Sequence, residues 1–157
     1  MSSKIQAEYF FNAYQVLSEN NEAIINRLES SPGNPPIGTK MFGVLPTMGI
    51  SIVCLAFSVE LYIKDVHYAL KGKSPLGHHI LKLFEMLPEQ VQQDIFTHHS
   101  INKYGWNFEE FKQEIKEISD GFEKWRYSYE TTTLLYNIYF ALVFIEAIKS
   151  VADAARI

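Results

Sequence analysis

The fold is decided by the stretch from Thr47 to Gly72, which reads TMGISIVCLAFSVELYIKDVHYALKG. Its first half is apolar on every side, and its second half carries charged residues at helical spacing. We expect Thr47 to cap the start of a helix and Gly72 to supply the residue that ends it. The stretch therefore predicts one long helix that is central in a bundle at one end and exposed at the other.

Helical spacing of apolar residues continues outward on both sides of this stretch, and no segment alternates with a period of two for long enough to predict a strand. Asn107 followed by Glu110 predicts a variant of the capping box. The sequence predicts an all-α fold, an up-and-down bundle of four long helices with a short helical insert between the second and third long helices. The other predicted helices run from Lys4 to about Glu29, Pro75 to Leu87, Pro88 to Phe96, Asn107 through Phe122, and Glu130 to Ala155.

The chain reads as a single domain over residues 1–157. It has 157 residues, of which 47% are hydrophobic. A chain of this size can bury a core without disulfides or a structural metal. The segment from Ser30 to Gly38 holds the only dense cluster of turn-forming residues, so we expect a flexible surface loop at about residues 30–40.

Charge and apolar runs limit the classes of function. The chain has 14 Lys plus Arg against 18 Asp plus Glu, a net charge of −4. This balance argues against charge-driven adhesion to nucleic acid or to anionic membranes. The apolar runs Met41–Val59 and Leu134–Ile145 are interrupted or too short to span a bilayer, and no signal peptide precedes Glu8. We expect a cytoplasmic protein that does not enter a membrane, in which the lone Cys54 packs as a small hydrophobe.

A local basic segment runs from Lys64 to Lys82. It carries four lysines against Asp65 alone, a local charge of +3, together with three histidines. This is the stretch best suited to meet a phosphate group. One helix face begins four residues before this segment and continues into it. That face is either a solvent-exposed polar stripe or part of a binding site. The residues of that face are Glu60, Lys64, His67 and Lys71.

Two further features carry candidate chemistry. His78 and His79 lie at or near a predicted helix start, where an imidazole suits an acceptor or a proton shuttle, or simply caps and packs. Arg126 stands among the aromatic residues of the octet Glu123 to Glu130. This arginine can stack, bind an anion, or pair with an internal carboxylate such as Glu60 or Glu130.

Metal and nucleophile chemistry find little support in the sequence. The two histidine pairs are His78–His79 and His98–His99. Adjacent histidines on a helix point about 100° apart, and no spacing matches a zinc helix or a di-iron bundle, so we predict no metal site. No phosphate-cradling Gly-rich loop and no nucleophile motif is present, and we expect no cofactor.

Four groups of residues together resemble a prokaryotic HEPN-type helical-bundle protein, from about residue 50 onward. They are Ser58-x-Glu60-x-x-x-Lys64, Lys71-Gly72-Lys73, Gly77-His78-x-Ile80-x-x-Leu83 and Trp125-Arg126-Tyr127-x-x-Glu130. The resemblance implies a helical bundle of four or more helices, frequent homodimerisation, and association with RNA cleavage or nucleotide binding. It also implies a toxin–antitoxin or anti-phage setting, with a protein partner such as a nucleotidyltransferase.

The sequence departs from the ribonucleases of that family. Those members carry an arginine, then four to six residues, then a histidine. Here Arg126 is followed at those positions by Thr131, Thr132 and Thr133, and Arg27 by Pro32, Gly33 and Asn34, while the given sequence ends one residue after Arg156. The nuclease motif is therefore absent, unless His78 reaches Arg126 in the folded bundle and replaces the missing histidine.

The leading expectation is a non-catalytic, HEPN-like homodimer that binds a nucleotide, RNA or a partner protein. Two alternatives stay open: a metal-independent ribonuclease toxin that uses Arg126 and His78, and a purely structural dimerisation module whose polar cluster fixes helix register. The expected ligand pocket consists of Glu60, Lys64, His78, Arg126, Tyr127 and Glu130.

Overall fold

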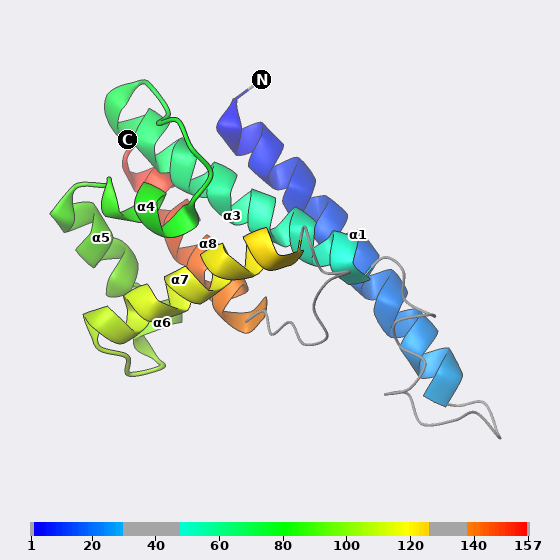
Figure 1. Ribbon diagram of the computed structural model, residues 1–157. Coiled ribbons are helices and arrows are strands. Elements are labelled where there is room, and N and C mark those ends of the chain that lie inside the picture. Colours follow the sequence, from blue (N-terminus) through cyan, green and yellow to red (C-terminus); the bar gives the residue numbers. More distant parts are fainter. Residues whose placement is uncertain (1, 30–47, 126–137, 157) are drawn as a thin grey trace.

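A computed structural model describes residues 2–29, 48–125 and 138–156, and these residues form seven α-helices and no strand (Figure 1). The predicted all-α class is confirmed for this part of the chain. None of its helices is long and apolar enough to cross a membrane. The helices are α1 (Ser3–Glu29), α3 (Met48–Lys71), α4 (Ile80–Glu85), α5 (Glu89–Phe96), α6 (His99–Asn102), α7 (Phe108–Trp125) and α8 (Ile138–Ala154).

Helix α3 is the central element. It packs along α1, as Figure 1 shows, and also contacts α4, α7 and α8. Leu55, Val59 and Ile63 are fully buried, because neighbours cover several sides of the apolar half of the helix. Near its end, Tyr68 and Leu70 are exposed. Burial nevertheless continues through Asp65, Val66 and His67, and Ile50 near the start of α3 is exposed, so the predicted change from a buried half to an exposed half is wrong except for the last turn.

The end of α3 follows the prediction. Gly72 has a φ of +66°, a left-handed conformation that favours glycine. Its amide donates to the carbonyl of Tyr68 at 2.8 Å, which closes the last turn. The predicted N-cap, Thr47, and the predicted loop at residues 30–40 lie outside the described residues.

The helix predicted from Pro75 to Leu87 is shorter in the structure, where α4 begins at Ile80. Gly77 has a φ of +101°, and His79 is extended and accepts a hydrogen bond from the Lys82 amide at 3.4 Å. His79 is therefore the N-cap of α4, and the chain from Gly72 to His79 is an irregular connection. The four-residue helix α6 was not predicted from the sequence.

Helix α7 begins with the predicted capping box. The Glu110 amide donates to Asn107 Oδ1 at 2.9 Å, and the Asn107 amide donates to Glu110 Oε2 at 2.8 Å. Two amides that the helix itself cannot satisfy are thereby paired. The helix then presents Phe111, Ile115 and Ile118 to the core, where all three are fully buried.

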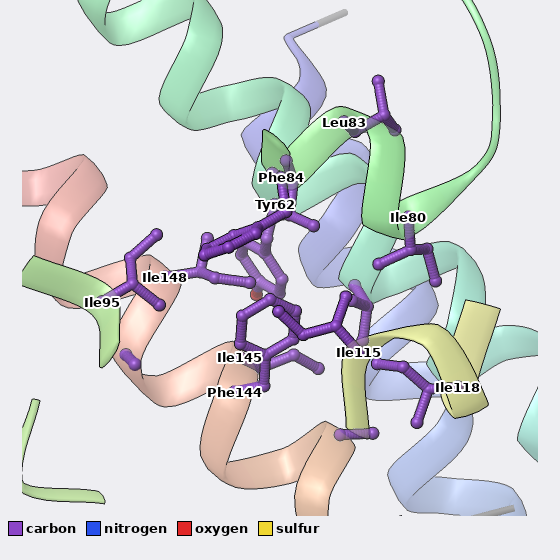
Figure 2. Packing of buried hydrophobic residues seen from close by; sticks show 14 of the residues in the cluster. Tyr62, Ile80, Leu83, Phe84, Ile95, Ile115, Ile118, Phe144, Ile145 and Ile148 are labelled. Carbon is purple, nitrogen blue, oxygen red and sulfur yellow. The ribbon is translucent and has the colours of Figure 1, made fainter. Parts of the chain in front are cut away.

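The core joins α3, α4, α7 and α8 through aromatic and branched side chains (Figure 2). Phe84 of α4 meets Phe111 of α7 edge to face, with ring centroids 5.7 Å apart, and Phe144 of α8 at 6.0 Å. Such contacts add to the free energy gained by burying the rings. Because Phe84 and Leu83 are held in this core, the connection that precedes α4 is fixed beside α3.

Candidate functional site

A buried carboxylate stands at the centre of the candidate site. Glu60 Oε1 accepts hydrogen bonds from Lys64 Nζ at 2.7 Å and from His78 Nδ1 at 3.0 Å. The Glu60 side chain is only 3% exposed. Its other oxygen, Oε2, is buried and has no hydrogen-bond partner within the part of the chain that the structure describes.

Two elements bring these three side chains together. Glu60 and Lys64 lie one turn apart on α3, so they share a face. His78 comes from the irregular connection before α4, and Ser74 in that connection donates to the Lys64 carbonyl at 3.2 Å. The structure thus gathers Glu60, Lys64 and His78, three of the six residues expected in the pocket.

The contact with Glu60 fixes the tautomer of His78. A carboxylate oxygen can only accept, so Nδ1 of His78 carries the hydrogen and Nε2 of a neutral ring keeps its lone pair. The His78 side chain is 74% exposed. An accessible imidazole held in this way can accept a hydrogen bond from a ligand or take up a proton.

Two cavities adjoin this cluster between α1 and α3, and both are lined by Gln6, Leu61 and Lys64. The larger cavity measures about 680 Å³, and Lys73 is its second cation. Hydroxyl groups provide further polar lining. The remaining lining residues of this cavity are Ser2, Ser3, Tyr68, Ser74, Pro75 and Leu76.

The smaller cavity measures about 530 Å³, and Tyr and Phe rings make up three of its ten lining residues. Phe10 of α1 stacks on Phe57 of α3 with centroids 5.2 Å apart and an interplanar angle of 27°. Tyr9 adds a third ring, and Cys54 also lines the cavity. Burial raises the pKa of the Cys54 thiol, as expected for a packed cysteine. Glu60, His78, Ala13 and the residues shared with the larger cavity complete the lining.

The interpretation of the α3 face as a solvent-exposed stripe is wrong for two of its four residues. Glu60 and His67 are each 2% exposed, because α1, α4 and the connection before α4 cover α3. His67 Nε2 donates to the Leu83 carbonyl at 2.8 Å. Burial lowers the pKa of His67, and the positive charge of Lys71 lowers it further, against the bond to Leu83, which raises it. His67 is therefore a neutral histidine that joins α3 to α4.

Sequence reasoning missed a second polar cluster. Asp65, 3% exposed in its side chain, pairs with Arg156, which also contacts Asp153 at 3.1 Å. Ser3 Oγ donates to Asp65 at 3.4 Å, and Lys4 pairs with Asp153 at 2.8 Å. The partners are up to 149 positions apart in sequence, so no local spacing could have revealed the cluster.

The aromatic cavity was missed as well. Tyr9 and Phe10 fit the first predicted helix by their position. Nothing in their spacing indicates that they share a cavity with Glu60, which lies 50 positions after Phe10. Their exposure, 61% and 36%, is the signal that sets them apart from core residues, and it is a property of the folded chain.

The other three expected pocket residues, Arg126, Tyr127 and Glu130, lie outside the described residues. Their placement at the pocket stays a prediction, as does a pairing between Arg126 and Glu60. Comparisons with protein-family models, curated proteins and solved structures gave no match to this chain.

Proposed function

We propose that this protein is a non-catalytic binding protein for a nucleotide or a short RNA, which it holds between α1 and α3. The observation that supports this best is a pair of adjoining cavities. The first is lined by two lysines, the second is lined by three aromatic rings, and Lys64 lines both. A nucleotide has the matching asymmetry, since an anionic phosphate is joined to a flat base.

Each part of the ligand has residues suited to it. Lys64 and Lys73 supply cations for the phosphate, and nearby serine hydroxyls and Gln6 supply polar contacts. Tyr9 and Phe10 offer rings on which a base can stack. Glu60 orients Lys64 and His78, the two groups that a ligand can reach.

The sequence assigns further roles in the same proposal. Arg126 engages phosphate beside Lys64, Tyr127 stacks or forms a hydrogen bond, and Glu130 orients the cations. These roles depend on the sequence and on the HEPN resemblance alone. We expect Arg126→Ala to abolish binding of a nucleotide without unfolding the protein.

The matched pair Lys73→Ala and Lys71→Ala tests the phosphate half of the site. Both lysines are exposed and only two positions apart, but only Lys73 lines the cavity. In titrations with fluorescently labelled ATP and with a 5′-phosphorylated oligoribonucleotide, Lys73→Ala should weaken binding about tenfold, roughly 1.4 kcal/mol. Lys71→Ala should bind like the unmodified protein.

Two results would contradict the proposal. One is that neither ATP nor the oligoribonucleotide binds at millimolar concentration. The other is that the two lysine variants weaken binding equally, which would indicate general attraction by the basic segment rather than a defined site. Circular dichroism of each variant checks that the helices remain.

A metal-independent ribonuclease is the second candidate, because the carboxylate of Glu60 holds His78 with Nε2 available to take a proton. The activity would need Arg126 near His78 to stabilise the charge on the phosphate. If so, the purified protein should cleave RNA in the presence of EDTA, and His78→Ala should stop the cleavage. RNA that stays intact after prolonged incubation would remove this candidate.

The remaining expectations, from helical spacing and from the HEPN resemblance, belong to the same proposal. They are an up-and-down arrangement of the four long helices, a homodimer, and a partner such as a nucleotidyltransferase in a toxin–antitoxin or anti-phage setting. The third alternative, a purely structural dimerisation module, would be favoured by a stable dimer in light scattering that binds neither ATP nor RNA.

A further inference from the structure

A second site lies away from the cavities, where α6 meets α8. His98, His99 and Glu146 each place one potential ligand atom within 4.8 Å of the other two. His99 Nε2 and Glu146 Oε1 are 3.1 Å apart, and the rings of His98 and His99 have centroids 4.2 Å apart. Glu146 comes from α8, so the two chain segments meet only in the folded protein.

The expectation that adjacent histidines cannot hold one ion does not apply to this pair. Adjacent side chains point about 100° apart only where both residues are helical. His98 has φ −58° and ψ 142°, and it is the residue before α6, whereas His99 is the first residue of the helix. The extended backbone at His98 turns the two rings to the same side, which is why they lie next to each other.

Nδ1 of His98 lies against two groups of Ser100. The Ser100 amide donates to Nδ1 at 3.3 Å, which makes His98 the N-cap of α6 and needs a ring with its hydrogen on Nε2. Ser100 Oγ lies 2.9 Å from Nδ1, and its own hydrogen is donated to the Val143 carbonyl at 2.9 Å, so this contact needs the hydrogen on Nδ1. Binding of an ion at Nε2 selects the second form, in which Nδ1–H donates to Ser100 Oγ, as the second ring N–H of histidine ligands commonly does.

The spacing of the three groups suits a small divalent ion. Ligand atoms about 2.0–2.2 Å from a tetrahedral zinc ion are about 3.4 Å from each other. The 3.1 Å between His99 and Glu146 is close to that value, and the side chains of these two residues are 79% and 56% exposed, so small rotations can adjust them. Two imidazoles and one carboxylate are a ligand set found at zinc sites that keep a position open for water or substrate.

We propose that His98, His99 and Glu146 form a binding site for a first-row divalent metal ion of the zinc type. Because the site draws on α6 and α8, an ion there would join the short helical insert to the last helix. The site shares no residue with the proposed nucleotide pocket, so either can exist without the other.

The test is calorimetric titration of the EDTA-treated, full-length protein with zinc chloride. We expect one ion bound per chain, with His99→Ala and Glu146→Gln each weakening binding at least tenfold. Both side chains are more than half exposed, so these variants should fold normally. Cobalt(II) gives a second readout, since its visible absorption spectrum reports the coordination of the ion.

A matched pair of histidine variants provides the control. His98 and His79 each precede a short helix, and each has its Nδ1 within 3.4 Å of an amide of that helix. Asparagine is a favourable N-cap, so His98→Asn and His79→Asn should both preserve the helix start. Only His98→Asn should weaken zinc binding. The proposal would be overturned if the unmodified protein bound no zinc at micromolar concentration. It would also be overturned if His98→Asn, His79→Asn and Glu146→Gln all bound zinc with equal affinity.

Discussion

At the scale of single residues, His67 shows how a polar group can be part of the core. Its Nε2–H is satisfied by the Leu83 carbonyl, so the neutral ring can be buried at little cost. Tyr62 differs, because its buried hydroxyl has no partner among the described residues. Burial and the nearby acidic groups raise the pKa of Tyr62 to about 12. The ring of Tyr62 contributes packing, and its hydroxyl adds no hydrogen bond within this part of the chain.

We predict that the protein loses stability as the pH falls below about 6.5, partly because of His67. Since burial lowers the pKa of folded His67, the unfolded chain takes up a proton first, near the ordinary histidine value of about 6.5. The resulting stability is fully present above that pH and is lost as the pH falls toward the folded pKa. Urea unfolding at several pH values should show this loss, and it should be smaller in His67→Gln.

His98 also makes the protein less stable at low pH, because burial lowers its pKa too. His67→Gln should therefore reduce the pH dependence of the free energy of unfolding without removing it. A variant whose free energy of unfolding varies with pH as much as that of the unmodified protein would contradict the assignment to His67.

At the scale of elements, local sequence signals set several helix ends. Gly72 ends α3 and the capping box starts α7, and in both cases the relevant hydrogen bonds lie within a few residues. The start of α4 depends on Gly77 and on His79, which caps the helix as the sequence allowed, but the predicted start at Pro75 is too early. Turn chemistry prevailed there over the pattern of apolar residues.

We predict that Asn107→Ala lowers the free energy of unfolding by about 1 kcal/mol, because it removes the side-chain acceptor for the Glu110 amide. Asn107→Gly should cost only a few tenths of a kcal/mol, since glycine is tolerated at an N-cap. Urea denaturation measures both. Gln113→Ala, an exposed change on the same helix, is the control and should stay within about 0.5 kcal/mol. Equal losses for all three variants would contradict the capping interpretation.

At the scale of the whole molecule, ion pairs join the ends of three helices. Asp65 of α3 pairs with Arg156, just beyond α8, and Asp153 of α8 pairs with Lys4 of α1. The Asp65 pair differs from the Lys4 pair, because Asp65 is buried whereas both partners of the Lys4 pair are exposed.

We predict that Arg156→Met lowers the free energy of unfolding by about 2–3 kcal/mol, because it leaves the buried Asp65 carboxylate without its main partner. The loss should be somewhat smaller than for a fully buried pair, since Arg156 is a third exposed. The double variant Asp65→Asn/Arg156→Met should recover part of that loss, since the amide carries no charge. Lys4→Ala should cost less than about 1 kcal/mol, as for an exposed pair. Equal losses for Arg156→Met and Lys4→Ala in thermal unfolding would refute this difference.

The sequence by itself determined the all-helical class, most helix bounds, the capping box and the shared helix face of Glu60 and Lys64, whereas the contact of His78 with Glu60, 18 positions away, depends on the packing of α4. These features arise from interactions within a few residues, or from helical spacing together with composition. Tertiary structure alone decided that Glu60 and His67 are buried, that Tyr9 and Phe10 line a cavity beside Lys64, and that Glu146 meets His98 and His99. The physical reason is that burial and proximity depend on which faces pack together, and local spacing carries no record of that choice.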